Sequence, residues 1–162
     1  MVIRDAHQDE LAEIGEIRVK AYLADGFLSP DSRYAPRLRE LGSDGAGPVL
    51  VAADHGGIAG TVMLQTWPNG GEFLRGADEA EIRALAVRPE ARGRGVGRAL
   101  VGAVIERAAS LGIRHLLLLT QPEMTTAHRI YDEAGFARLP DRDISPEPGV
   151  NLLAYGLDLD VR

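Results

Sequence analysis

The stretch that decides the fold reads Val87-Arg88-Pro89-Glu90-Ala91-Arg92-Gly93-Arg94-Gly95-Val96-Gly97-Arg98-Ala99-Leu100-Val101, a turn rich in glycine and arginine between two apolar segments. Upstream, residues 80–87 have strand character. Downstream, apolar residues recur on one helical face, and Gly112 is placed to follow the helix end; the face holds Val96, Leu100, Val104, Ala108 and Leu111. The apolar run in 115–120 then predicts a buried strand. The segment therefore predicts a parallel strand–helix–strand crossover.

The rest of the chain predicts the elements that surround this crossover. Strands are expected at 2–4, 49–54, 58–67, 136–139 and 152–159, and helices at 7–24, 36–41 and 125–134. The glycines in 55–57 suit a hairpin, whereas 42–48, 68–71 and the proline-rich 140–149 are expected to be loops. The sum is an α/β or α+β domain, spanning 1–162, with a sheet that is antiparallel at its start and parallel at the central crossover.

Composition limits the function classes. The 162 residues suit one domain, and 45% hydrophobic and 26% charged residues are typical of a globular chain. The net charge of -6 argues against nucleic acid or anionic membrane as a partner, and would mildly favour a cationic substrate. No apolar run of membrane-spanning length and no signal-peptide pattern is present, so we expect a cytoplasmic protein. The absence of cysteine excludes disulfides and a cysteine nucleophile.

The glycine turn, residues 92–98, has the features of an anion site. Unpaired amides at a helix N-terminus attract anions, and glycines let a phosphate approach them. Three arginines supply further donors, so a pyrophosphate is the expected ligand. The turn lacks the Gly-Lys-Ser/Thr of a Walker loop and the third glycine of the G-x-G-x-x-G pattern, which disfavours ATP and NAD. RNA binding through the arginines is a weaker alternative.

Two segments resemble signatures of the GNAT superfamily, the acyl-CoA-dependent N-acyltransferases. Arg92-Gly93-Arg94-Gly95-Val96-Gly97 is similar to its Arg/Gln-x-x-Gly-x-Gly/Ala pattern, and Ile130-Tyr131-Asp132-Glu133-Ala134-Gly135-Phe136 to its tyrosine and Gly-Phe signature. The resemblance, sharp over 80–139, implies the GNAT fold, with a mixed, mostly antiparallel sheet and helices on both faces. It also implies acetyl-CoA as donor. Met124 stands where many relatives carry an asparagine near the pantetheine arm.

The resemblance also implies where the donor and the chemistry lie. Cofactor-binding groups are expected along the strand end and the turn, at Leu85, Ala86, Val87, Arg92, Gly93, Arg94, Gly95, Val96, Gly97 and Arg98. Glu81 is the first candidate for the base that deprotonates the amine, with Glu79 on the same strand face as the alternative. Tyr131 is the candidate acid for the thiolate. A solvated carboxylate and a core tyrosine are the respective alternatives.

The function expected is N-acyl transfer, moving acetyl directly from acetyl-CoA to a primary amine of a small molecule or protein. The alternative is a catalytically inactive coenzyme A-binding or sensing module. The histidines have no metal-ligand spacing, so no metal is expected. The acceptor pocket is expected from 22–41 and 140–149, and a homodimer is left open.

Overall fold

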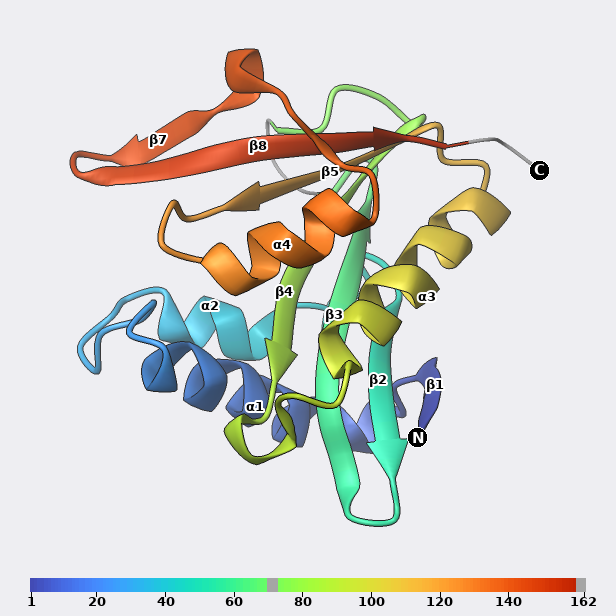
Figure 1. Cartoon of the computed structure of the whole chain (residues 1–162), viewed down its shortest axis with the longest axis vertical. Coiled ribbons are helices and arrows are strands. Elements are labelled where there is room, and N and C mark those ends of the chain that lie inside the picture. Colours follow the sequence, from blue (N-terminus) through green and yellow to red (C-terminus); the bar gives the residue numbers. More distant parts are fainter. Residues whose placement is uncertain (70–72, 160–162) are drawn as a thin grey trace.

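The computed structural model describes residues 1–69 and 73–159, which form one twisted sheet with helices on both faces (Figure 1). The strands are β1 (Val2–Asp5), β2 (Val49–Asp54), β3 (Gly57–Thr66), β4 (Glu79–Val87), β5 (His115–Thr120), β6 (Ala137–Arg138), β7 (Ile144–Glu147) and β8 (Val150–Asp158). The α-helices are α1 (Leu11–Ala24), α2 (Ala35–Glu40), α3 (Val96–Ser110) and α4 (Thr125–Glu133). Part of the predicted loop 68–71 and the end of the chain lie outside the described residues.

The strand order confirms the predicted crossover at the centre of the sheet. The order is β1-β2-β3-β4-β5-β8-β6, and β7 pairs with β8 outside this path. β4 and β5 are parallel and are connected through α3, whereas the other strand pairs within the described ranges are antiparallel. In Figure 1, β5 and β8 run crosswise to β2, β3 and β4, which shows how strongly the sheet twists.

Two helical layers bury the faces of the sheet. On one face, the predicted stripe of α3 packs against alternate residues of the strands in a core that includes Leu50, Val62, Leu64, Ala80, Ile82, Val96, Leu100, Val104 and Ala108. On the other face, α1 covers the intervening residues in a core that includes Ile14, Ile17, Ala21, Val49, Val51 and Met63. Leu111, predicted to share the α3 stripe, follows the helix end and is 52% exposed. Because side chains alternate along a strand, Ala80 and Ile82 of β4 face α3, whereas Glu79 and Glu81 lie on the face that α1 covers.

The prediction of a loop at 140–149 was wrong. A 3₁₀ turn spans Pro140–Arg142, and β7 follows it. All four β7 residues are exposed, and the register between β7 and β8 is irregular, which allows Pro146 within the strand. The predicted helix at 7–24 is likewise divided into a 3₁₀ turn, Gln8–Glu10, and α1. Over the described ranges, no helix combines the length and apolar character that crossing a bilayer requires.

Candidate active site

The sheet opens between β4 and β5. Only Glu79–Ile82 pair with β5, in register with His115–Leu118. Just beyond this paired segment, β4 has a bulge. Arg83 pairs with Met63 and Ala86 pairs with Thr61, so two residues of β4 lie opposite the single β3 residue Val62. Ala84 adopts a φ of 55° there. The β4 backbone from 83 to 87 therefore has an edge that β5 does not cover, and we call it the open edge.

Along this part of β4, the backbone N–H and C=O groups of successive residues point alternately to β3 and to the open edge. The carbonyl of Ala86 faces β3, since a Cβ at Gly60 would lie 2.9 Å from its oxygen. The carbonyl oxygen of Val87 instead accepts hydrogen bonds from the Arg92 guanidinium, from Nη2 at 3.3 Å and from Nε at 3.4 Å. Leu85 lies two residues before Val87 and directs its backbone to the same side. Of the three predicted β4 positions, Leu85 and Val87 thus present backbone to the open edge, and Ala86 does not.

The glycine turn leads from this strand into α3. Gly93 and Gly95 have φ values of 80° and 77°, and a Cβ at either would meet no atom within 4 Å, so backbone geometry is what requires glycine there. Gly97 differs, because its Cβ would lie 3.0 Å from Cδ1 of Ile130 on α4. The amides of 93–98 donate to no acceptor in the described part of the chain. They form the set of free donors at a helix N-terminus that an anion requires.

The arginines of the turn hold it between two helices. Arg92 forms an ion pair with Asp25, which directly follows α1. Arg98 pairs with Glu133 of α4 at 2.8 Å between Nη2 and Oε2. Arg94 is exposed and has no carboxylate within ion-pair distance among the described residues. Two of the three predicted phosphate ligands therefore already have acidic partners.

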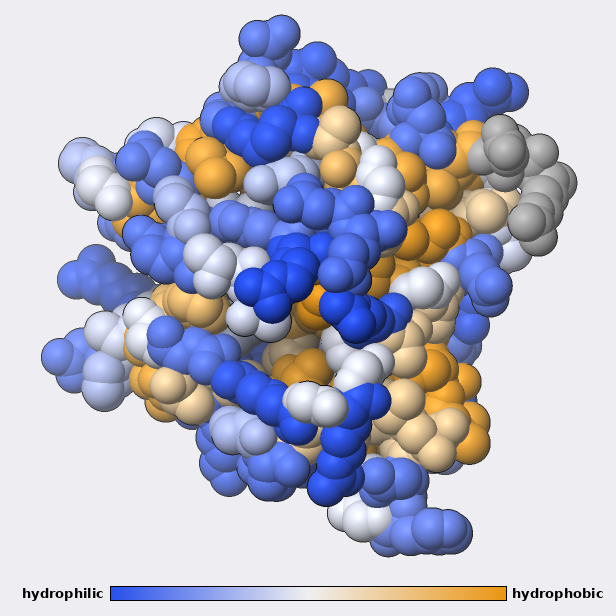
Figure 2. Space-filling view, in the orientation of Figure 1, coloured by the Kyte–Doolittle hydropathy of each residue, from blue (hydrophilic) through white to orange (hydrophobic). Residues whose placement is uncertain are grey.

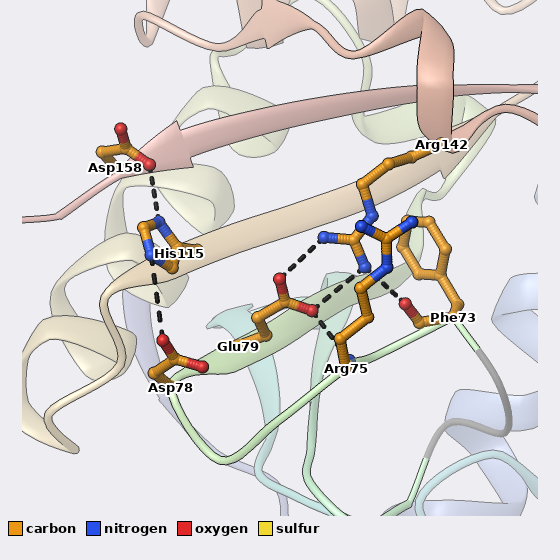
Figure 3. A network of polar contacts seen from close by, with 7 residues as sticks. All are labelled: Phe73, Arg75, Asp78, Glu79, His115, Arg142 and Asp158. Atoms are coloured by element: carbon orange, nitrogen blue, oxygen red, sulfur yellow. Dashed lines mark hydrogen bonds and ion pairs between the residues drawn. The ribbon is translucent and has the colours of Figure 1, made fainter.

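The two candidate bases on β4 have different surroundings. Glu79 is held by Arg142, whose Nη1 lies 2.7 Å from Oε2, and it accepts the backbone N–H of Arg75 at 2.9 Å (Figure 3). The Arg142 guanidinium lowers the pKa of Glu79. Glu81 is 6% exposed, its carboxyl has no hydrogen-bond partner within the described ranges, and burial raises its pKa to about 7. A carboxyl with this pKa exchanges its proton near neutral pH, as a general base does.

Tyr131 lies on α4 at the opposite face of the sheet. The residue is 5% exposed, and its ring packs against Phe136 with 5.6 Å between the ring centroids. Burial raises the pKa of the Tyr131 hydroxyl, and Tyr22 on α1 raises it further. Tyr22, on the helix that covers the other face of the sheet, thus acts electrostatically on Tyr131. The hydroxyl keeps its proton at neutral pH and is able to donate it.

The surface above the opening is hollowed between α4 and the α1–α2 pair (Figure 2). Polar residues on the α1 side of β4 include Arg18, Gln65 and Arg83, which the sequence did not single out, and Tyr34, which lies in the segment 22–41 expected to line the acceptor pocket. Arg18 had a detectable signal, since a charged residue interrupts the stripe of Ile14, Ile17 and Ala21 and shares their face. Arg142 had none, because a single arginine in a proline-rich segment carries no pattern.

A search of protein-family models matches residues 11–136 to the Acetyltransferase (GNAT) family. The chain belongs to this family. A mycothiol acetyltransferase of Cellulomonas flavigena is 38% identical over 68% of the chain and 32% of its own length. An uncharacterized N-acetyltransferase of Schizosaccharomyces pombe is 33% identical over 76% of the chain and 72% of its own length. The chain spans about a third of the length of the mycothiol acetyltransferases that it matches.

The structural comparison agrees with the family. The structure of yncA from Salmonella typhimurium, determined with its cofactor acetyl-CoA, superimposes with a TM-score of 0.73 and 25% identity, covering 100% of this chain and 95% of that one. The GNAT fold expected from the sequence is therefore confirmed. Within the described ranges, no three acidic or histidine side chains are arranged to hold a metal ion.

Proposed function

We propose that this chain transfers an acetyl group from acetyl-CoA directly to a primary amine of a small molecule or protein. The observation that carries the proposal is the open edge of β4, which has the free amides of the glycine turn at one end and Glu81 and Tyr131 on either side. The family match and the relatives named as acetyltransferases support it.

The residues present fit acetyl-CoA. The unpaired amides of 93–98 suit the pyrophosphate, with Arg94 free to add a contact. The backbone of Leu85 and Val87 suits the amides of the pantetheine arm, which would lie along the open edge as a strand does. Acetyl-CoA supplies the activated acyl group. The Arg92 guanidinium donates hydrogen bonds to the Val87 carbonyl, and we expect these hydrogen bonds to break when the pantetheine arm binds there.

Glu81 and Tyr131 divide the proton transfers between them. An alkylammonium with a pKa of about 10.4 is mostly protonated at neutral pH, so the acceptor must lose a proton before it can attack. Glu81, with its pKa near 7, accepts this proton directly or through one water. The N–H of Val87 stabilises the negative charge that develops on the carbonyl oxygen. Tyr131, kept protonated by burial, donates to the departing thiolate.

We prefer Glu81 to Glu79 as the base. Glu79 is committed to Arg142 and holds the 140–142 turn against the start of β4, so taking a proton would weaken that ion pair (Figure 3). Glu81 has no such partner in the part of the chain that the structure describes. Its proton can therefore move without a structural change.

Acetyl-CoA binding by Gly95→Glu, compared with Gly95→Ala, tests the placement of the donor. Both variants strain a backbone with φ of 77°, but only glutamate adds a negative charge at the phosphate site. We expect glutamate to weaken binding at least about 100-fold beyond the effect of alanine, as loss of charge-assisted contacts implies. Equal binding by the two variants would refute the phosphate site. Thiol release across a panel of amines then tests transfer itself, and binding without release would indicate a coenzyme A-binding module.

A further inference from the structure

Arg18 is a fully buried cation with only part of its guanidinium in use. It lies on α1, and its relative exposure is 0%. Nη1 donates to the carbonyls of Leu38 at 3.1 Å and Leu41 at 2.7 Å, at the end of α2. Nε and Nη2 are buried without a hydrogen-bond partner among the described residues. Burial of unpaired donors on a charged group is costly, so Arg18 leaves a buried positive charge that no acceptor in the described part of the chain compensates fully.

A second guanidinium lies near the first. Arg83 on β4 is half-buried and donates from Nη1 to Oε1 of Gln65 and from Nη2 to the hydroxyl of Tyr34, both at 3.0 Å. Burial lowers the pKa of Arg18 to about 10, and the charge of Arg83 contributes to this shift. Two like charges therefore influence each other across the space between α1, α2 and β4. We call Arg18, Tyr34, Gln65 and Arg83 the Arg18–Arg83 cluster.

The described residues supply no carboxylate that balances the cluster. Neither arginine forms an ion pair within 4.0 Å in that part of the chain. Glu79, on the same face of β4, is neutralised by Arg142. Burial raises the pKa of Glu81 to about 7 even though the charge of Arg83 lowers it, so this carboxyl is only partly ionised at neutral pH. The acceptor side of the opening is thus locally cationic, although the chain has a net charge of -6.

We propose that the Arg18–Arg83 cluster binds the carboxylate of the acceptor, so that the substrate class is a small molecule carrying both a primary amine and a free carboxylate. The proposal rests on the proposed function. Arg83 lies two residues after Glu81 on one strand, about 6–7 Å along the backbone, a span that an amino-acid-sized molecule bridges. The amine then faces Glu81 while the carboxylate faces Arg83.

The side chains define how the carboxylate would be held. Tyr34 is 39% exposed and caps Arg83 through its hydroxyl, which is a weaker partner for a guanidinium than a carboxylate is. The incoming carboxylate takes the place of this hydroxyl on Arg83. Arg18 lies behind it in the protein interior and supplies a second positive charge at low dielectric. Gln65 fixes the other edge of Arg83 and so holds its orientation.

Matched acceptor pairs test the proposal. Each pair is an amino acid and its carboxamide, which differ in the negative charge beside the amine, and kcat/KM is referred to the concentration of neutral amine because the carboxylate also raises the pKa of the amine. For the wild-type protein we expect kcat/KM to be about 10- to 100-fold higher for the acid, mainly through KM, as one charge-assisted hydrogen-bonded contact implies. Arg83→Gln should abolish this preference by weakening the acids more than the amides, because the loss of Arg83 also raises the pKa of Glu81 and so affects both members of a pair. Arg114→Gln, which removes an exposed arginine before β5, is the charge-matched control and should retain it.

A binding measurement separates this proposal from the proposed function. The N-acetyl forms of the same pairs are titrated calorimetrically into the protein with coenzyme A present, which requires no turnover. Preferential binding of the acids without thiol release from any amine would support the carboxylate site and refute the transferase. Thiol release with no preference between acid and amide would refute the carboxylate site and leave the transferase standing.

Arg18→Met, checked by thermal melting, tests the buried charge. If it folds, a preference for acids equal to that of wild type would exclude Arg18 from the site. If it does not fold, the Arg83→Gln comparison alone decides the proposal.

Discussion

Replacing Glu81 by glutamine should stabilise the protein at alkaline pH while reducing its activity. Burial raises the pKa of Glu81 from its ordinary 4.5 to about 7. Between these pH values the folded protein holds a proton that the unfolded chain has lost, so folding becomes less favourable as the pH rises. A difference of about 2.5 pH units, at about 1.4 kcal/mol per unit, corresponds to a cost of about 3 kcal/mol once both states are ionised. Glutamine is neutral throughout and avoids that cost.

Urea unfolding at pH 5 and pH 8 measures this effect. The free energy of unfolding of Glu81→Gln, relative to wild type, should increase by about 2–3 kcal/mol between the two pH values. Steady-state kinetics on the same preparations should show a wild-type kcat/KM that rises through pH 7. The variant should lose about 10²- to 10⁴-fold and lack that inflection. Both results depend on the same buried carboxyl.

Glu79→Gln is the matched control, since it removes a carboxyl from the same face of β4. Loss of the Arg142 ion pair should destabilise the fold by about 1–3 kcal/mol at neutral pH and leave the inflection near pH 7 in place. Because Arg142 lowers the pKa of Glu79, this stabilisation is present at neutral pH and is lost as the solution is acidified through that pKa. A stability difference for Glu81→Gln that does not change with pH would refute the assignment of a buried, proton-holding carboxyl. A fully active Glu81→Gln enzyme would refute its role as base.

Two other substitutions test the remaining parts of the site. Tyr131→Phe should lower kcat by about ten-fold to a few hundred-fold with unchanged acetyl-CoA affinity, because the ring still packs on Phe136; full-speed turnover would show that the hydroxyl is only a core group. Asp25→Asn should tighten acetyl-CoA binding about two- to five-fold in calorimetry, since Arg92 no longer leaves an ion pair to reach the donor. Weaker binding by that variant would mean that Asp25 positions Arg92 instead.

The sequence was sufficient for the crossover because its signals are local. A buried strand, a helix with one apolar stripe and the glycines of the turn each follow from residues close together in the chain. β7 escaped prediction for a physical reason. An exposed strand at the margin of a sheet buries no alternating face, and Pro146 is acceptable where the ladder is irregular. Composition alone therefore described 140–149 as a loop.

The site was predictable only where a residue type suggested its role. Glu81 and Tyr131 remain predictions, but their burial and raised pKa values come from packing that the sequence does not display. The difference between Glu79 and Glu81 depends on Arg142, 63 positions away from Glu79. Arg18 and Arg83 come close enough to interact electrostatically because α1 and β4 pack together on one face of the sheet. Such long-range pairing follows from topology, and single-sequence patterns do not contain it.

The separation of β4 from β5 also affects how the protein behaves in solution. Unpaired strand backbone is a template for pairing with any extended chain, including that of another copy, and so promotes aggregation. With the pantetheine arm along the open edge as proposed, the donor acts as a removable strand that shields this template. Acetyl-CoA should therefore slow heat-induced aggregation more than adenosine 3′,5′-bisphosphate, which lacks the arm, when the two are compared at equal occupancy.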